Sequence, residues 1–331
     1  MVSRLAVVAI GRNEGERLLR CLDSVAPGGV PLVYVDSGST DGSAEAARLR
    51  GASVVELDLT TPFTAARARN EGLARALSLA PDLELVQFVD GDCEVFPGWL
   101  DAGVRALAEQ PGVAAVCGRV RERNREATVY NRLCDLEWDQ PPGETLACGG
   151  NALYRVRAFQ EAGGFDPGLI GGEEPELCVR LRRRGWKILR LGHDMVWHDA
   201  AMTQFGQWWR RTLRGGWSFA EGAAMHGASP ERHWVRENRS ILFWGTLVPL
   251  ASLLLAVPSR GVSLLLLAGY PVLARRIFRS ARRKGVAPPD ARALAFFTVL
   301  GKFPQAIGQA QFAMMKVLGR RRRLVDWRVA P

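Results

Sequence analysis

Short apolar runs alternate with helix-like segments along the first 90 residues, and this alternation constrains the fold more than any other feature of the chain. The runs cover residues 5–10, 30–35, 53–57 and 83–89. Continuous apolar strands that are separated by helices indicate a mostly parallel sheet with helices on both faces. We therefore predict an α/β fold whose ligands bind at the carboxyl ends of the strands.

The chain is expected to divide near residue 230, where the charge changes. Residues 1–230 carry 26 Lys or Arg and 30 Asp or Glu, whereas residues 231–331 carry 18 and 4. The basic part also holds the long apolar runs, and this combination indicates an anionic membrane surface as the partner rather than a nucleic acid. We predict an α/β domain over 1–230 and a membrane-associated helical region over 231–331.

The C-terminal region is expected to hold two candidate membrane spans and one interfacial segment. Residues 241–258 are uncharged and would form a helix of about 27 Å, close to the ~30 Å of bilayer hydrocarbon. The second candidate, 261–278, has a shorter apolar part, so a re-entrant or interfacial segment stays open, and 291–318 is interpreted as interfacial. Because basic residues flank the pair and only Arg260 lies between them, we expect a hairpin with both ends cytoplasmic.

Cysteine usage and the N-terminus indicate the compartment. The six cysteines are widely spaced, without a CxxC pair, and are expected to be reduced thiols of a cytoplasmic domain. The first apolar run is too short for a signal peptide. We therefore expect the α/β domain to lie in the cytoplasm.

Two acidic sequences follow predicted strands. Asp36 opens the sequence DSGSTDG after the second run. A carboxylate there can accept hydrogen bonds from a base or ribose, although an ordinary turn that begins a helix is the alternative. Asp90, Gly91 and Asp92 end the fourth run. Because residues i and i+2 of a strand point to the same side, the two carboxylates can hold Mg²⁺ or Mn²⁺ and, through it, a diphosphate.

Two further features supply a candidate ligand and a candidate base. His198 follows the strand expected at 187–191 and is a candidate third metal ligand, although a lone histidine can equally be structural. The sequence GGEEPEL at 171–177 places Glu173 and Glu174 beside a proline that suits the first position of a helix. The pair is interpreted either as a general base on a glycine-rich loop or as a charged helix start.

Together and in this order, these sequences resemble the family 2 glycosyltransferases of GT-A fold over about residues 3–220. The matching segments are VVAIGRNEGERLLRCLDSV, VDSGSTDGS, ARARNEGL, FVDGDCEV, GGNALYRVRAFQEAGGFDPG and GGEEPELCVRLRRRGWKI. The resemblance implies a GT-A nucleotide-diphospho-sugar transferase domain at 1–230. It also implies a hexosyltransferase-type activity that inverts the anomeric carbon of the sugar.

The resemblance further implies roles for individual residues. The nucleotide-sugar donor would contact Ile10, Asn13, Glu14, Asp36, Ser39, Arg67, Asp90, Gly91, Gly150 and Asn151. Within ARARN, Arg67 is chosen over Arg69. The metal would be held by Asp92, with Asp90 and His198 as further ligands. Glu174 matches the family's base, which is usually Asp, and Glu173 is the alternative base, expected to orient the loop or the sugar.

Substrates and competing functions follow from the same comparison. The resemblance implies a UDP-sugar donor, with GDP- and dTDP-sugars open, and a glycan or lipid-linked acceptor. The C-terminal region resembles that of bacterial members that build exopolysaccharide or lipid-linked glycans, which implies a location at the cell inner membrane with the catalytic domain in the cytoplasm. Polymerising members carry QxxRW, whereas residues 207–211 read QWWRR, which favours addition of a single sugar over a processive polysaccharide synthase. The competing class, a dinucleotide-binding oxidoreductase, would need GxGxxG after the first strand, where the chain offers only Gly11.

Overall fold

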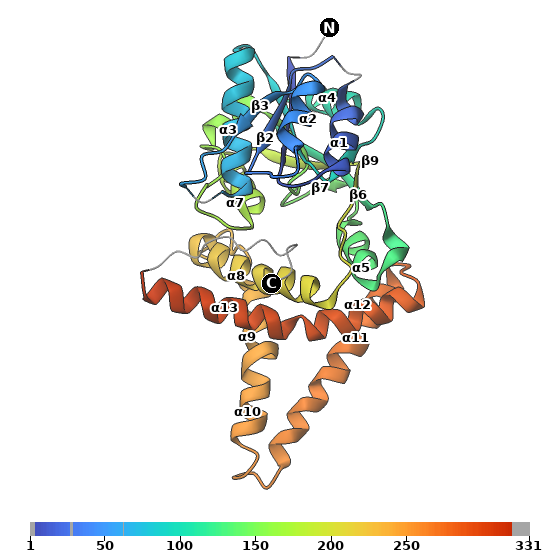
Figure 1. The fold of residues 1–331 in the computed structure, drawn as a ribbon. Helices are drawn as coiled ribbons and strands as arrows, with labels where there is room; N and C mark the ends of the chain where they lie inside the picture. Colours follow the sequence, from blue (N-terminus) through green and yellow to red (C-terminus); the bar gives the residue numbers. More distant parts are fainter. Residues whose placement is uncertain (1–3, 27–28, 62, 320–331) are drawn as a thin grey trace. The chain divides into compact units, whose positions relative to one another are not determined.

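Two compact units make up the protein in the computed structural model, which describes residues 4–26, 29–61 and 63–319 (Figure 1). Unit 1 contains the chain up to Asn124 together with Cys134–Ala201. Unit 2 contains Arg125–Leu133 and the chain from Met202 onward. The boundary that we predicted at residue 230 therefore falls inside unit 2.

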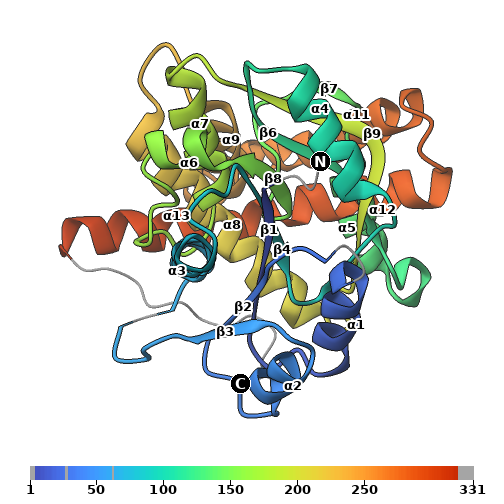
Figure 2. The ribbon, with the colours of Figure 1, turned by 90° about the horizontal axis from the view of Figure 1, so that it is seen from above.

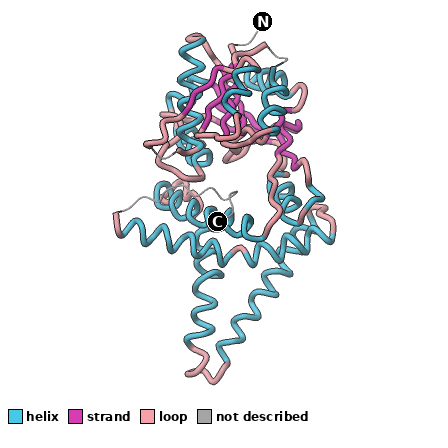
Figure 3. The backbone as a smooth tube through the Cα atoms, in the orientation of Figure 1, coloured by secondary structure: helices cyan, strands magenta, loops and turns pink. Residues whose placement is uncertain are grey.

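Unit 1 is built on one mixed sheet, drawn in magenta in Figure 3. Within the described residues its nine strands are β1 (Leu5–Gly11), β2 (Leu32–Asp36), β3 (Ser53–Glu56), β4 (Leu85–Asp90), β5 (Cys93–Val95), β6 (Val113–Glu122), β7 (Gly143–Glu144), β8 (Ala152–Arg155) and β9 (Lys187–His198). Their order is β3-β2-β1-β4-β8-β6-β9-β5, with β7 beside β9. The strands β1 to β4 pair in parallel, as predicted, whereas β8 is antiparallel to both of its neighbours.

Helices cover both faces of this sheet (Figure 2). They are α1 (Glu16–Val25), α2 (Ser43–Leu49), α3 (Ala65–Leu79), α4 (Trp99–Glu109), α6 (Val156–Glu161) and α7 (Glu173–Arg183). Helix α3 lies on one face, and α1 and α2 lie on the other. At Gly72 helix α3 approaches the sheet so closely that a Cβ atom would lie 2.3 Å from Cγ1 of Val8.

An aromatic cluster fixes β4, the strand that carries the DGD sequence. The rings of Phe88, Tyr154, Phe159 and Phe165 pack with centroids 5.1–6.1 Å apart, and all four side chains are buried. Burial of this much aromatic surface is a large stabilising contribution. The cluster holds the C-terminal half of β4 in place, and Asp90 is the last residue of that strand.

Unit 2 is helical. Helix α5 (Val129–Trp138) begins in it, after the short η2 (Arg125–Ala127), and the other elements are α8 (Phe205–His226), α9 (Val235–Leu242), the π-helix η3 (Phe243–Leu247), α10 (Val248–Leu254), the 3₁₀-helix η4 (Val262–Ala268), α11 (Gly269–Arg283), α12 (Pro288–Leu300) and α13 (Lys302–Val317). Helices α8 and α13 approach so closely that a Cβ atom on Gly216 would lie 2.1 Å from the Gln305 carbonyl oxygen. This packing explains why the chain joins unit 2 from Met202, well before residue 230.

The predicted membrane spans are not confirmed. Residues 241–258 are divided among the end of α9, η3, α10 and the turn after it, and 261–278 are divided between η4 and α11. Among the described residues, we find no single helix with the length and apolarity to cross a bilayer. The predicted interfacial segment 291–318 forms most of α12 and α13, which meet at Gly301.

Candidate active site

The carboxyl ends of three parallel strands bring the predicted donor residues together. Strand β1 lies between β2 and β4, with Gly11 paired to Asp36 on one side and Ile10 paired to Asp90 on the other. The two acidic residues that were predicted from strand ends therefore flank the end of β1. This edge is where ligands of α/β sheets bind.

Asp36 organises the loop that follows β2. Its carboxylate is buried, and its Oδ2 accepts hydrogen bonds from the backbone N–H groups of Gly38 and Ser39 at 2.9 and 2.7 Å. The hydroxyl of Tyr34 donates to Oδ1 at 3.1 Å. Burial and the charge of Asp36 raise the pKa of Tyr34, so this hydroxyl stays protonated. Asp36 thus fixes the turn as well as offering acceptor capacity at the strand end.

The loops after β1 and β2 are joined by side chain to backbone hydrogen bonds. The N–H of Asn13 donates to Oγ of Ser39 at 2.9 Å, and the N–H of Thr40 donates to Oδ1 of Asn13 at 2.8 Å. Asn13 has a φ of 54°, which asparagine tolerates better than most residues. Glu14 is buried and pairs with Arg17 at 2.8 Å. Of the predicted donor residues of both loops, Asn13, Asp36 and Ser39 therefore form one hydrogen-bonded rim, while Glu14 pairs with Arg17.

Arg69 is the centre of a buried ionic cluster that our sequence analysis missed. Its Nη2 lies 2.7 Å from Oδ1 of Asp90, and its Nη1 lies 2.7 Å from Oε1 of Glu173. Burial would lower the pKa of Arg69, but the two carboxylates outweigh it and raise that pKa, so the guanidinium stays charged. This one side chain connects the DGD sequence to the start of α7.

Arg67, the arginine chosen from the sequence, points elsewhere. Its guanidinium pairs with Glu71 at 2.8 Å and donates to the carbonyl oxygens of Asp58 and Thr61. The DGD sequence is contacted by Arg69 instead. A signal for this was present, because Ala66, Arg69 and Leu73 share one face of α3, and the apolar members of that face mark it as buried. A donor contact of Arg67 stays a prediction.

Gly150 and Asn151 complete the surroundings of Asp90. Oδ1 of Asn151 accepts the backbone N–H of Asp90 at 2.8 Å, and its Nδ2 donates to Oδ2 of Asp90 at 3.4 Å. A Cβ atom on Gly150 would lie 2.4 Å from Nη2 of Arg69, so a side chain at this position would displace the guanidinium. Gly91 likewise sits under the side chain of Glu14, whose Cγ would be 3.2 Å from an added Cβ. The predicted residues of this segment are thus gathered around one carboxylate.

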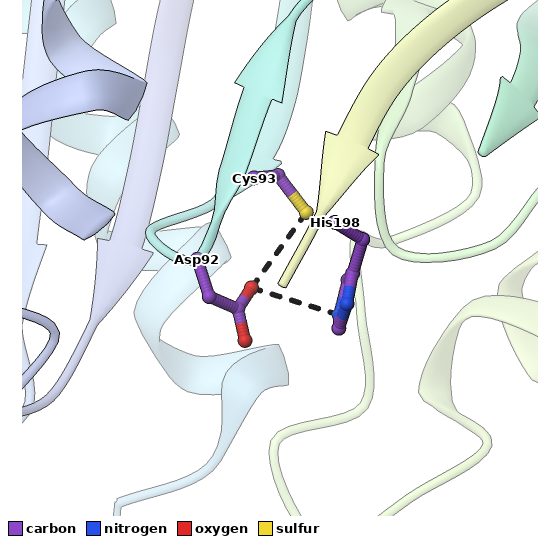
Figure 4. Close-up of side chains that lie close together, drawn as sticks. All are labelled: Asp92, Cys93 and His198. Carbon is purple, nitrogen blue, oxygen red and sulfur yellow. Dashed lines mark hydrogen bonds and ion pairs between the residues drawn. The ribbon is translucent and has the colours of Figure 1, made fainter. Parts of the chain in front are cut away.

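Asp92, in the turn before β5, and His198, the last residue of β9, point toward each other (Figure 4). Oδ1 of Asp92 lies 3.7 Å from Nε2 of His198 and 3.6 Å from Sγ of Cys93. Carboxylate oxygen and imidazole nitrogen are ligands that Mn²⁺ accepts, and their convergence fits a single divalent ion. Burial raises the pKa of the Cys93 thiol well above its usual value, so this sulfur stays protonated and is the poorest ligand of the three.

A second carboxylate lies behind His198. Oε2 of Glu122, whose side chain is fully buried, is 3.8 Å from Nδ1 of His198, and the two residues are paired across β6 and β9. Burial lowers the pKa of His198, but the charges of Asp92 and Glu122 raise it by more, and the net direction is upward. The ring of Trp138 packs on the imidazole at 4.6 Å between centroids. These contacts hold the imidazole with Nε2 toward Asp92.

The two glutamates at the start of α7 have different surroundings. Glu173 is ion-paired with Arg69, and its side chain is partly exposed. Glu174 is buried, and its Oε1 accepts from the N–H of Cys148 at 2.6 Å and from the thiols of Cys148 and Cys178 at 3.1 and 2.9 Å. The donors that contact Glu174 are neutral groups, whereas the partner of Glu173 carries a charge.

Comparison with known proteins gives a family match over nearly half of the chain. Residues 7–163 match the family described as Glycosyl transferase family 2. The chain is 25% identical to the glycosyltransferase AglE of Haloferax volcanii over 217 residues, which cover 62% of this chain and 69% of that protein. It is 26% identical to the N-acetylglucosaminyl-diphospho-decaprenol L-rhamnosyltransferase of Mycobacterium tuberculosis over 300 residues, covering 72% of this chain and 96% of that protein.

Solved structures share the fold. The mannosyltransferase PcManGT of Pyrobaculum calidifontis, solved with GDP-Man and Mn²⁺, superposes with a TM-score of 0.64 at 21% identity, covering 93% of this chain and 87% of that one. TarS 1–349 of S. aureus superposes with a TM-score of 0.52 at 16% identity, covering 96% and 92%. At these identities the likeness concerns the fold, which is an α/β fold of GT-A type with a mixed sheet.

Proposed function

From the premise that this chain is a glycosyltransferase with a Glycosyl transferase family 2 domain, we propose that it transfers one sugar from a nucleotide-diphospho-sugar to an acceptor hydroxyl with the help of a divalent cation. The observation that carries the proposal is the convergence of Asp92 and His198 beside the strand ends that hold Asp36 and Asp90. A dinucleotide-binding oxidoreductase, the competing class, is dropped because of the family match.

The donor in this proposal is a UDP-sugar. Asp36, Ser39 and Asn13 form the rim where the nucleoside would bind, and the chain offers acceptor groups there for a base and a ribose. The structural neighbours support a nucleotide-sugar in general, because PcManGT was solved with GDP-Man and S. aureus TarS 1–349 with UDP. A GDP-sugar is therefore the first alternative to test.

The cation would be held by Asp92 and His198. Asp90 is a weaker candidate ligand, since Arg69 and Asn151 already contact its carboxylate. When bound, Mn²⁺ or Mg²⁺ would neutralise the negative charge of the departing diphosphate. The cluster of Asp90, Arg69 and Glu173 would orient the donor. If either ion pair of Arg69 opens, its guanidinium can donate a hydrogen bond to a phosphate oxygen of the donor.

Glu174 is proposed as the general base, and inversion at the anomeric carbon as the outcome. A base must take a proton from the acceptor hydroxyl, and a carboxylate that is held in an ion pair is less available to accept it. Glu173 is ion-paired with Arg69, whereas Oε1 of Glu174 is held by an amide and two thiols. This difference favours Glu174 as the base and Glu173 as a residue that positions Arg69.

The acceptor is proposed to be a glycan or a lipid-linked glycan at the cytoplasmic face of the inner membrane. The relative from Mycobacterium tuberculosis is named for a diphospho-decaprenol acceptor, which supports a lipid-linked substrate here. The basic composition of residues 231–331 supports a position beside an anionic surface. Addition of a single sugar is proposed, and processive synthesis is the alternative.

A screen of nucleotide-sugars with the full-length protein tests this function. The protein is incubated with UDP-, GDP- and dTDP-sugars and Mn²⁺, and release of the nucleoside diphosphate is measured, with NAD as the unrelated nucleotide. We expect hydrolysis of one donor class, loss of that hydrolysis in excess EDTA, and stabilisation of the fold against heat by the matching diphosphate with Mn²⁺. Hydrolysis that is unchanged by EDTA would contradict metal dependence, and stabilisation by NAD alone would contradict the function.

A further inference from the structure

Unit 2 contains a helical hairpin with an apolar outer surface. Its first arm is formed by α9, η3 and α10, its second arm by η4 and α11, and a short loop joins them (Figure 3). Large apolar side chains on the loop and both arms are exposed, the most exposed being Val257 (88%), Leu254 (73%), Leu265 (72%), Val272 (69%), Leu253 (66%) and Val262 (64%). Contiguous apolar surface of this kind marks a binding site on a protein.

Polar side chains of the hairpin turn inward and bond to its own backbone. The hydroxyl of Ser263 donates across the arms to the carbonyl oxygen of Ser252 at 2.8 Å, and Ser252 donates to the carbonyl of Val248 at 2.8 Å. The hydroxyl of Tyr270 donates to the carbonyl of Trp244 at 2.6 Å. Polar groups that are satisfied within a segment are the condition for placing that segment in hydrocarbon. Contact with water or with a polar partner would not require that these groups be satisfied within the hairpin.

From the base of the hairpin to its apolar end, both arms carry a basic residue, then an aromatic one, then leucines. Arg239 precedes Trp244 and the leucines of α10 on the first arm. On the second arm the leucines of η4 precede Tyr270 and then Arg275. The rings of Trp244 and Tyr270 lie 5.7 Å apart, so the two aromatic levels coincide. This order, with Trp and Tyr between basic residues and aliphatic ones, is that of a membrane–water interface.

The charge of the hairpin is of one sign. No acidic residue occurs between Glu237 and Asp290, while this stretch contains seven arginines and one lysine. Five of the arginines, Arg275, Arg276, Arg279, Arg282 and Arg283, lie on α11 and are exposed. Basic residues next to an apolar end complement an anionic lipid surface, because anionic headgroups bind the arginines and acyl chains contact the apolar side chains.

We propose that this hairpin inserts its apolar end, α10 and η4, into a lipid bilayer while the arginines of α11 bind anionic headgroups. The inference deepens the membrane location in the proposed function, but it does not depend on sugar transfer, since vesicle binding is measured without donor or acceptor. From Trp244 to Leu254 the helical part of the first arm rises about 15 Å, less than the ~30 Å hydrocarbon core. Arg260 then extends its guanidinium from the inserted end toward polar headgroups.

Vesicle flotation of the full-length protein tests the proposal. Vesicles are made of phosphatidylcholine alone or with phosphatidylglycerol. The double substitution Leu253→Glu and Leu254→Glu should reduce partitioning to both by at least about tenfold, because apolar area no longer enters the hydrocarbon. The triple substitution Arg275→Gln, Arg276→Gln and Arg279→Gln should reduce partitioning to the anionic vesicles by on the order of a hundredfold, from about 1 kcal/mol per charge. The control Leu49→Glu alters an exposed leucine of unit 1 and should change neither.

A spectroscopic readout keeps the test valid if a variant folds poorly. All six native cysteines are buried, so Leu254→Cys can be labelled selectively with an environment-sensitive fluorophore. Its emission should shift to the blue with vesicles, and the shift should be absent for a label at Leu49→Cys. An unchanged emission at position 254, or a dimer that buries the label without any lipid, would overturn the proposal. If the hairpin variants lose vesicle binding but still hydrolyse the donor in detergent, the proposed sugar transfer is unaffected.

Discussion

Nη2 of Arg69 lies 2.7 Å from Oδ1 of Asp90, so the first carboxylate of the DGD sequence is held by a buried cation of the protein itself. The same guanidinium pairs with Glu173 at the start of α7. Two segments more than 80 residues apart in the sequence are therefore joined through one side chain. A donor phosphate that entered here would meet an arginine already fixed in place, which lowers the cost of ordering it on binding.

Arg69→Ala is expected to be strongly destabilising as well as inactive. Removing one partner from a buried ionic cluster leaves two carboxylates uncompensated, at a cost of about 3–5 kcal/mol in the free energy of unfolding. Arg67→Ala, the matched control on the same helix, breaks partly exposed contacts and should cost about 1 kcal/mol or less. Chemical denaturation of both variants measures the difference. Equal losses for the two arginines would contradict the central place of Arg69.

Glu174→Gln and Glu173→Gln separate the base from the positioning residue. Gln keeps the size of Glu but loses the basic oxygen, so Glu174→Gln should lower turnover by on the order of 10²–10⁴ while donor affinity is preserved. Glu173→Gln weakens the pairing with Arg69 and should raise the donor KM more than it lowers kcat. Steady-state kinetics of transfer to the acceptor decides between them. The opposite pattern would reverse the two roles, and normal kinetics for both would place the base elsewhere.

The part of the site at the ends of the parallel strands could be predicted from the sequence. The part that depends on pairing between distant segments could not. Asp36 and Asp90 could be placed together because the ends of neighbouring parallel strands share an edge. The contact between Glu122 and His198 depends on the pairing of β6 with β9, which no local pattern specifies. Arg67 was chosen over Arg69, although the helical period places Arg69 on the buried face of α3.

Glu122→Gln should weaken metal binding although it replaces no proposed metal ligand. Glu122 faces Nδ1 of His198 from behind and also accepts the backbone N–H of Ala200 at 3.1 Å. Carboxylates in this position orient a ligating histidine, and their loss typically costs 10- to 100-fold in metal affinity. Titration of Mn²⁺ followed by electron paramagnetic resonance gives the affinity directly. Glu94→Gln, a more exposed carboxylate on the neighbouring β5, is the control and should bind Mn²⁺ as the unchanged protein does.

The thiols around Glu174 should be inert in the folded protein. Burial raises the pKa of Cys178 to about 12 and that of Cys148 well above its usual value. Because the thiolate is the reactive form, a thiol reagent at pH 8 should modify neither cysteine until the protein unfolds. Mass spectrometry of peptides after brief alkylation, with and without denaturant, measures this. Rapid modification of Cys178 under native conditions would show that the site opens.

Mn²⁺ affinity should depend on pH through His198. The net effect of Asp92 and Glu122 raises the pKa of His198 above 6.5 despite its burial, and the metal must displace that proton. Below the raised pKa the affinity should therefore increase about tenfold per pH unit, and above it the increase should stop. Without metal the sign is opposite, because the protonated imidazole stabilises the fold at low pH and this contribution is lost as pH rises through the raised pKa. In Glu122→Gln one source of the upward shift is gone, so both the plateau of Mn²⁺ affinity and the loss of stability should move to lower pH. Titrations of the two proteins across this pH range measure both effects, and a plateau at the same pH in each would show that Glu122 does not act on His198.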